Sequence, residues 1–330
     1  MSKVTIVVPI YNTSKLLKRC IDSIKNQTLN DFEVIFVNDG STDNSEEVCK
    51  ALIKSCHNFR VLTKDNGGLS SARLYGFRNA TSPYIVFVDS DDYLEQDYLF
   101  ELYSSIESSN ADISLCGYYT DNCNKKTQHL FPDGLNSIEG RSSMWNKYLL
   151  PQLSLMDGKG EFIPSFMWLR MYRRDILLES DFISERDVLL EDVAFSFSIR
   201  NRIQKVTIVN KPLYNYVVNE GSLTLSYRKN AWNKMKNLCS YLSKCFDEDN
   251  VDNSHRLNGI KYLALHFCLR NITCLSYGDY KPEFKKICHD EMTKDLLHST
   301  SVMKLSKSNM LIWLVTRYNL CRTFYILKNR

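Results

Sequence analysis

The N-terminal third of the sequence alternates between short apolar runs and segments with helical spacing of apolar residues. The residues of the first helical segment, Leu17, Cys20, Ile21 and Ile24, recur every three or four positions. Such alternation predicts a Rossmann-like α/β fold, in which a mostly parallel sheet is flanked by helices. The apolar runs occupy residues 4–8, 33–37, 60–63, 84–88 and 113–117.

The rest of the chain divides by composition. Residues 119 to about 160 are rich in Asn, Lys, Gly and Asp, which predicts loops. A mixed segment follows to about residue 227, and the chain then becomes helical and basic from Asn230. We expect three regions: 1–118, 119–228 and a helical extension over 229–330. Within the first region, Ser41 or Thr42 is the expected N-cap of the second helix.

Charge and cysteine content exclude several classes of protein. The chain has 42 Lys and Arg against 38 Asp and Glu, a net charge of +4, which argues against binding nucleic acid. Its 11 cysteines form no C-x-x-C pair, which favours a reducing compartment without structural zinc. We find no apolar stretch with the length of a signal peptide or of a membrane span, so we expect a cytoplasmic location.

Polar residues follow each of the first four predicted strands. In open parallel sheets, ligands bind beyond the carboxyl ends of the strands. We therefore expect these four segments to line one crevice. They are Pro9–Asn12, Asn38–Asp43, Asn66–Arg73 and Asp89–Asp92.

The fourth segment, Asp89–Asp92, contains three aspartates: Asp89, Asp91 and Asp92. Carboxylates this close together repel one another unless a cation or hydrogen-bond donors compensate. Oxygen ligands select Mg²⁺ or Mn²⁺, which commonly complete their coordination with phosphate oxygens. The alternative is a helix N-terminus that Asp91 or Asp92 caps.

The other strand ends carry weaker signals. Asp39 precedes a Gly-Ser turn that leaves room for a flat ligand such as a base or ribose, although such turns often only start a helix. Gly67 and Gly68 permit close backbone approach, and Arg73, one turn into the next helix, is able to reach a diphosphate. A solvent-facing arginine is the alternative. Together, four such motifs on consecutive strand ends indicate a nucleotide site.

With these motifs, the chain resembles the family 2 glycosyltransferases of GT-A fold, closely over residues 1 to about 110 and more loosely to about 222. The resemblance implies a nucleotide-sugar donor, most simply a UDP-sugar, and a divalent cation, Mn²⁺ or Mg²⁺. Asn38 stands where many relatives have a second Asp. The resemblance also assigns residues to the nucleotide. They are Pro9, Tyr11 and Asn12 beside the base, Asp39 on the uracil, Gly67 and Arg73 near the base and diphosphate, and Asp89 with Ser90 on the ribose side. Asp91 is assigned to the metal.

The second half adds an acidic pair in apolar sequence, Glu191 and Asp192. In the family that it resembles, the Asp of this pair is the proposed catalytic base, and Glu191 is the second candidate. A helix-capping pair is the alternative. Trp168 is a candidate for stacking on an acceptor sugar or for a place in the core. Near Gly221 and Ser222, Val218 and Asn219 stand where relatives commonly have an Arg, which argues against a phosphate contact from this loop.

The C-terminal stretch from Met310 to Arg330 mixes aromatic, aliphatic and basic residues at helical spacing. It is suited to lying on an anionic membrane surface, or to packing on the rest of the protein with its cations outward.

The resemblance therefore implies an inverting glycosyltransferase that uses a nucleotide-sugar donor and a glycan or lipid-linked acceptor in bacterial-type polysaccharide assembly. Two other functions remain open. A nucleotidyltransferase needs a glycine-rich basic loop after the first strand, and Pro9–Asn12 is neither. A noncatalytic sugar-nucleotide-binding protein has no need of Asp89, Asp91 and Asp192 together.

Overall fold

A computed structural model describes residues 2–122, 125–150, 163–218, 228–249, 254–299 and 307–328. By its contacts the chain forms two compact units. Gly221, Ser222 and residues 151–162 of the predicted loop region lie outside the described residues. The first unit comprises Met1–Gln152, Ile163–Glu185 and Glu191–Asn219, and the second comprises Leu153–Phe162, Arg186–Leu190 and Glu220–Arg330.

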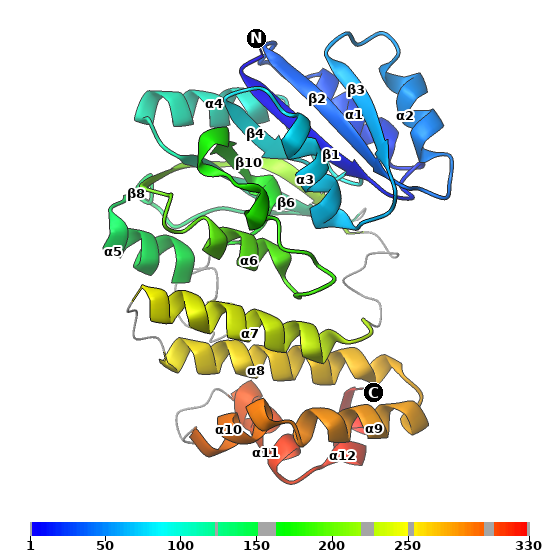
Figure 1. The fold of residues 1–330 in the computed structure, drawn as a ribbon, viewed down its shortest axis with the longest axis vertical. Helices are drawn as coiled ribbons and strands as arrows, with labels where there is room; N and C mark the ends of the chain where they lie inside the picture. The colour runs from blue at the N-terminus through cyan, green and yellow to red at the C-terminus, as the bar shows by residue number, and fades with distance from the viewer. Residues whose placement is uncertain are drawn as a thin grey trace. The chain divides into compact units, whose positions relative to one another are not determined.

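The first unit is built on one mixed sheet, in the order β3-β2-β1-β4-β9-β6-β10-β5, with β7 paired to β6 and β8 to β10 (Figure 1). Its first four strands are parallel, whereas β9 runs antiparallel to both β4 and β6. The strands are β1 (Val4–Ile10), β2 (Phe32–Asp39), β3 (Phe59–Lys64), β4 (Tyr84–Phe87), β5 (Tyr93–Leu94), β6 (Ile113–Asp121), β7 (Lys126–His129), β8 (Ser137–Glu139), β9 (Arg170–Arg173) and β10 (Lys205–Val217).

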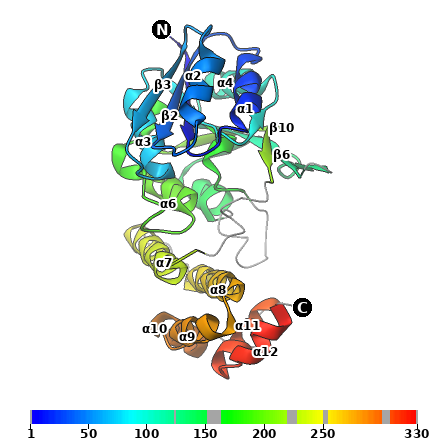
Figure 2. The ribbon, with the colours of Figure 1, turned by 90° about the vertical axis from the view of Figure 1, so that its right-hand side faces the viewer.

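Helices cover both faces of this sheet (Figures 1 and 2). Three-residue 3₁₀ turns flank β9 at Met167–Leu169 and Arg174–Ile176, and another spans Glu179–Asp181. The longer helices are α1 (Leu17–Lys25), α2 (Ser45–Ile53), α3 (Leu69–Asn79), α4 (Tyr98–Ser109) and α6 (Glu191–Ser198), and the short α5 (Arg141–Ser143) leads into a π-helix, Met144–Leu149.

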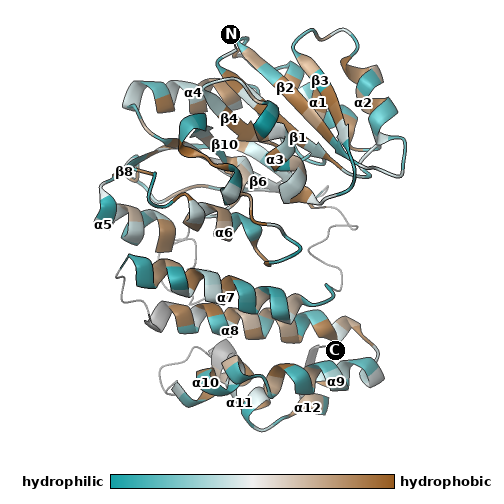
Figure 3. Ribbon diagram, in the orientation of Figure 1, coloured by the Kyte–Doolittle hydropathy of each residue, from teal (hydrophilic) through white to brown (hydrophobic). Residues whose placement is uncertain are grey.

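The core of this unit lies around β1. All seven of its residues are buried, since helices cover both faces and strands flank both edges. Val7, for example, lies beside Ile35 of β2 and Phe87 of β4, and Gly76 of α3 comes so close that an added Cβ would lie 2.3 Å from Val7. Figure 3 shows the hydrophobic residues along β2 and β4. This packing brings the carboxyl ends of β1 to β4 to one edge.

The structure confirms the predicted order of strands and helices over the first 118 residues and corrects two details. The second helix begins at Ser45 with Asn44 as its N-cap, so neither Ser41 nor Thr42 is the cap. The reason is tertiary, because Asn12 accepts a hydrogen bond from the Thr42 N–H and holds that segment in a loop. The polar region after residue 118 also contains more than loops, since it forms β7, β8 and α5.

From Asn230 onward, the described part of the second unit is mainly helical, as predicted. The side chains of Trp232, Met235, Leu238 and Leu242 recur at helical spacing and are buried. Within the described residues, no helix is both long and apolar enough to cross a membrane. The helices of the second unit are α7 (Ala231–Glu248), α8 (Ser254–Asn271), α9 (Tyr277–Cys288), α10 (Glu291–Ser299), α11 (Lys307–Arg317) and α12 (Cys321–Lys328), with a 3₁₀ turn at Ile272–Cys274.

Candidate active site

The segments after β1 and β2 are tied together by Asn12. Its side-chain oxygen accepts hydrogen bonds from the N–H groups of Thr42, at 2.8 Å, and Asp43, at 3.3 Å. The residue has a left-handed backbone with φ 54°, which asparagine tolerates better than most side chains. Pro9 is buried, whereas Tyr11 is 50% exposed at this edge. The predicted base-binding group is thus assembled around an asparagine that shapes the loop, with the Tyr11 ring open to a ligand.

Asp39, at the end of β2, is buried and fully engaged. Its two carboxylate oxygens accept the N–H groups of Gly67, at 3.0 Å, and Gly68, at 2.7 Å. Lys64, the last residue of β3, forms an ion pair with it at 2.7 Å and compensates its charge. Gly40 has φ +66°, and a Cβ there would lie 2.8 Å from the nitrogen of Asn66. Asp39 therefore joins the ends of β2 and β3, and its contact with a base stays a prediction.

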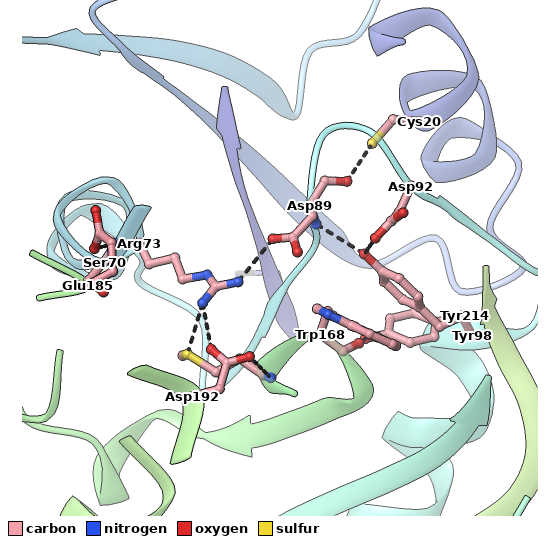
Figure 4. Close-up of polar contacts among 11 residues, drawn as sticks. Cys20, Ser70, Arg73, Asp89, Asp92, Tyr98, Trp168, Glu185, Asp192 and Tyr214 are labelled. Atoms are coloured by element: carbon pink, nitrogen blue, oxygen red, sulfur yellow. Dashed lines mark hydrogen bonds and ion pairs between the residues drawn. The ribbon is translucent and has the colours of Figure 1, made fainter. Parts of the chain in front are cut away.

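Arg73 joins the two halves of the site. Its guanidinium donates to Asp89 at 3.0 Å and to Asp192 at 2.9 Å, two residues from segments far apart in the sequence (Figure 4). The side chain is only 2% exposed. Burial alone would lower the pKa of Arg73, but the neighbouring Asp89 and Asp192 raise it above its ordinary value. Its Nε is buried without a hydrogen-bond partner in the described part of the protein. Arg73 is thus a buried cation between the donor-side and the candidate base carboxylates.

Glu191 and Asp192 are the first two residues of α6, so a helix-capping role is compatible with their position. Tertiary contacts give them more specific environments. Asp192 accepts from Arg73 and, through its other oxygen, from the Met167 N–H at 3.3 Å. Burial raises the pKa of Asp192 although Arg73 opposes the shift. Burial, reinforced by Asp192, raises the pKa of Glu191 to about 7. Carboxyls with raised pKa values are suited to accept a proton near neutral pH.

The Asp89–Asp92 turn is held by Tyr214 of β10. The Tyr214 hydroxyl donates to Asp92 at 2.8 Å and accepts the Asp89 N–H at 3.1 Å. Asp92 is 1% exposed, and burial raises its pKa well above the usual range. The predicted alternative of a helix cap at Asp91 or Asp92 is wrong, because β5 follows them and α4 begins only at Tyr98. Asp92 therefore supports the turn, with Asp89 and Asp91 on it.

The carboxylate oxygens of the Asp89–Asp92 turn are suited to bind a hard cation. Asp89 exposes 24% of its side chain and Asp91 is half-buried. Their oxygens suit Mg²⁺ or Mn²⁺, which need only one or two protein carboxylates when phosphate oxygens complete the coordination. Among the described residues, no three His, Cys, Asp or Glu side chains are grouped as a metal cage. Ser90 lies within the turn, with its hydroxyl 3.0 Å from that of Thr13.

Trp168 lies in an aromatic cluster. Its ring stacks on Tyr214 with 4.2 Å between centroids and on Phe166 with 4.8 Å, and the residue is 4% exposed. Of the two roles that the sequence allows, a place in the core fits this burial. Stacking of an acceptor sugar on Trp168 would need the cluster to open.

Three residues of the site escaped sequence reasoning. Lys64 is the last residue of β3 and forms an ion pair with Asp39. Its position at the end of a predicted strand was a sequence signal that could have identified it. Tyr214 belongs to a Tyr214-Asn-Tyr216 segment that resembles a Tyr-x-Tyr segment of relatives, and this resemblance did not indicate its contacts with Asp89 and Asp92. Glu185 binds the N–H groups of Leu69 and Ser70 at the start of α3, at 2.9 and 3.1 Å, and nothing near it in the sequence indicates this.

Known proteins similar to this chain have related architecture and sequence. The chain is 32% identical over 231 residues to glycosyltransferase GlyA of Streptococcus pneumoniae, covering 67% of this chain and 31% of GlyA. It is 34% identical over 222 residues to the uncharacterized glycosyltransferase EpsJ of Bacillus subtilis, covering 67% of this chain and 62% of EpsJ. The chain thus matches less than two thirds of the length of either relative.

Among solved structures, residues 1–349 of S. aureus TarS in complex with UDP have a TM-score of 0.64 with 17% identity, covering 99% of this chain and 90% of that one. This likeness shows the GT-A fold. Glycosyltransferases with this fold commonly use a divalent metal. The family model described as glycosyl transferase family 2 matches residues 5–179, more than half of the sequence. The chain therefore belongs to glycosyl transferase family 2.

Proposed function

We propose that this protein is an inverting glycosyltransferase that moves a hexosyl or N-acetylhexosaminyl group from a UDP-sugar to a hydroxyl of a glycan or lipid-linked acceptor, in polysaccharide assembly. The observation that carries the proposal is the Arg73 bridge between Asp89 and Asp192. It joins the carboxylate turn on the donor side to a carboxylate able to accept a proton. The UDP in the TarS structure supports the choice of nucleotide.

In this mechanism Asp192 accepts the proton of the acceptor hydroxyl. The acceptor oxygen forms a bond to the anomeric carbon, and the bond from that carbon to the β-phosphate oxygen breaks, so that UDP leaves with the electron pair. Arg73 favours the ionised form of Asp192, which keeps the base ready. A Mg²⁺ or Mn²⁺ ion at Asp91 would supply positive charge that stabilises the departing diphosphate. Glu191 is the second candidate for the base.

The nucleotide site is tested first by calorimetry. UDP, GDP, CDP and dTDP are titrated into the wild type and Asp91→Ala, with and without Mn²⁺. We expect one diphosphate to bind with a dependence on Mn²⁺ that Asp91→Ala weakens. Failure of all four to bind would remove the main support for the proposal. Release of pyrophosphate from a nucleoside triphosphate and a sugar phosphate would instead indicate a nucleotidyltransferase.

The base is assigned by comparing two neighbouring isosteric variants. Asp192→Asn should reduce kcat about 100-fold or more, since general-base catalysis contributes about 10²–10⁴-fold, with UDP binding retained. Glu191→Gln, the matched control, should keep most of the activity. Transfer assays with single-turnover kinetics measure both. The reverse order of losses would assign the base to Glu191, and binding of UDP without transfer in the wild type would favour a noncatalytic protein.

We also propose that α11 and α12 bring the protein to an anionic membrane surface, where a lipid-linked acceptor would lie. Met310, Leu311, Leu314 and Tyr318 are all exposed and share one helical face. Residues 296–330 contain six Lys and Arg and no Asp or Glu. An apolar face beside cations matches the chemistry of anionic lipid headgroups.

Co-sedimentation with vesicles tests this contact. The wild type should sediment with phosphatidylglycerol vesicles and much less with phosphatidylcholine vesicles. Salt at about 0.5 M should weaken binding to the anionic vesicles because it screens charge. The double variant Leu311→Ser with Leu314→Ser should lose binding. Leu178→Ser, at an exposed leucine of the first unit, is the control. Equal sedimentation of the double variant and the control would contradict the proposal.

A further inference from the structure

The start of α3 is bound by two carboxylates from different parts of the chain. The first N–H groups of a helix have no partner within the helix and need one from outside. Asp39 accepts the N–H groups of Gly67 and Gly68, and Glu185 accepts those of Leu69, at 2.9 Å, and Ser70, at 3.1 Å. Four consecutive amides are thus satisfied, and a negative charge at a helix N-terminus is also favourable. Figure 4 shows Glu185 against Ser70, with Arg73 farther along the same helix.

Gly68 is shaped to receive the Glu185 carboxylate. Its φ of +93° lies in the region that glycine adopts most easily, and a Cβ there would lie 1.7 Å from the Glu185 Oε1. Any other residue at position 68 would therefore push the carboxylate away. The Gly67–Gly68 turn is accordingly needed for the Glu185 contact, besides any approach of a nucleotide.

Glu185 and Asp192 both hold α3, on either side of residues 186–190. Glu185 binds the first turn of the helix, and Asp192 binds Arg73, one turn later. Between them, Leu190 has φ 61°, an unfavourable backbone for a leucine, directly before the acidic pair. Such a conformation persists only where its surroundings impose it, and the two attachments to α3 are contacts of that kind.

We propose that Glu185 is a positioning residue for sugar transfer, which holds the first turn of α3 so that Arg73 stays aligned with Asp192 and Asp89. This inference rests on the proposed function. Glu185 binds the first turn of α3, and Arg73 lies on the next turn, so its effect on Arg73 passes through the helix. Its charge also contributes to the raised pKa of Glu191. The loss of this cap affects the chemical step more than donor binding, since Asp39 continues to hold Gly67 and Gly68.

The experiment compares Glu185→Ala and Glu185→Gln with a matched control, Glu179→Ala. Glu179 forms an ion pair with Arg78 at the opposite end of α3, and both side chains are about half exposed. The control variant therefore removes a carboxylate that contacts the same helix but leaves the contacts of its first turn intact. We expect kcat of Glu185→Ala to fall about 10- to 100-fold, because misplacement by about 1 Å can cost about 100-fold. The KM for the donor should change less than about threefold, and Glu185→Gln, which keeps one acceptor oxygen, should be intermediate.

Two further measurements separate positioning from a loss of fold. Formate, a small carboxylate, should restore part of the activity of Glu185→Ala by binding the exposed N–H groups, and should not affect Glu179→Ala. The acidic limb of the pH profile of kcat should move to higher pH in Glu185→Ala, because a displaced Arg73 lowers the pKa of Asp192 less. Thermal unfolding of all variants identifies any that fail to fold, in which case Glu185→Gln carries the comparison.

The outcomes distinguish this inference from the proposed function. If the wild type and Glu179→Ala transfer sugar and the Glu185 variants match them in kcat and in pH profile, the positioning role is wrong while the function stands. Absence of transfer by the wild type would refute the proposed function itself. A drop in the stability of Glu185→Ala without any rescue by formate or shift in the pH profile would show that Glu185 only stabilises the fold.

Discussion

At the scale of single residues, Glu191 and Asp192 show how neighbours in sequence acquire different chemistry. Asp192 is held by Arg73 and by the Met167 N–H, which stabilise its charge. Burial, reinforced by Asp192, raises the pKa of Glu191 to about 7, although Arg73 opposes the shift. Burial also raises the pKa of Asp192, but this carboxylate accepts hydrogen bonds from Arg73 and Met167. Which carboxyl accepts a proton is therefore decided by packing.

Replacing Glu191 by Gln should stabilise the protein at high pH. The pKa of Glu191 is raised from an ordinary 4.5 to about 7 on folding, so its ionisation opposes folding; the effect is absent below pH 4.5 and complete above pH 7. The variant should thus gain on the order of 1–3 kcal/mol over the wild type at pH 8, since one pKa unit corresponds to about 1.4 kcal/mol. Urea unfolding at pH 4 and pH 8 measures it. An equal difference at both pH values would contradict the raised pKa.

At the scale of secondary structure, α3 is the element on which the site depends. Its first turn is bound by Glu185, Arg73 projects from its second turn, and Arg78 near its end forms only an exposed ion pair. Exposed ion pairs contribute about 0–1 kcal/mol, whereas a helix cap contributes about 0.5–2 kcal/mol. The functional contacts of α3 are therefore concentrated in its N-terminal half.

Gly68→Ala should destabilise the protein more than Gly140→Ala. Both glycines have a positive φ, +93° and +84°, so both variants bear the backbone cost of about 1–2 kcal/mol. A Cβ at Gly68 also meets the Glu185 carboxylate, whereas a Cβ at Gly140 has nothing within 4 Å. Chemical denaturation of both variants gives the difference, which should be at least about 1 kcal/mol, the value of a lost cap. Equal losses would mean that the Glu185 contact contributes nothing to stability.

At the scale of the whole molecule, the chain passes between its two compact units more than once. Residues Arg186–Leu190 belong to the second unit, while Glu185 before them and Glu191 after them belong to the first. The second unit is therefore not a simple C-terminal addition in sequence. Its boundaries cut through the segment that carries the candidate base, so a truncation near residue 228 would leave Leu153–Phe162, Arg186–Leu190 and the residues from Glu220 to the cut behind.

The cysteines provide a test of how the units open. The cysteines that the structure describes are all free thiols, with Cys274 exposed and Cys56 half-buried. Burial raises the pKa of Cys49 in the first unit, and of Cys268 in the second, to about 12, which leaves little reactive thiolate at pH 8. Among the cysteines that the structure describes, peptide mapping after thiol labelling should find Cys274 and then Cys56 modified first. Rapid labelling of Cys49 or Cys268 in native buffer would show that the corresponding unit opens readily.

The sequence by itself determined the main strands and helices of the first 118 residues, though not the short β5, and the meeting of four polar motifs at one sheet edge. Hydropathy period and turn residues are local signals, and parallel strands bring their carboxyl ends together whatever the details of packing. Arg73 was predicted one turn into the third helix, and α3 indeed begins at Leu69. The start of α2 was not, because the bond from Asn12 to the Thr42 segment depends on two strands lying side by side.

Only the tertiary structure decided what the polar side chains bind. Arg73 reaches Asp192 across 119 positions of sequence, Glu185 reaches Leu69 across 116, and Tyr214 reaches Asp89 across 125. No local pattern encodes such pairs, because a buried charge or an unsatisfied amide takes whichever partner the folded chain brings within about 3 Å. The residue types at the strand ends indicated the chemistry, and the packing of α3, α6 and β10 around them decided which groups share it.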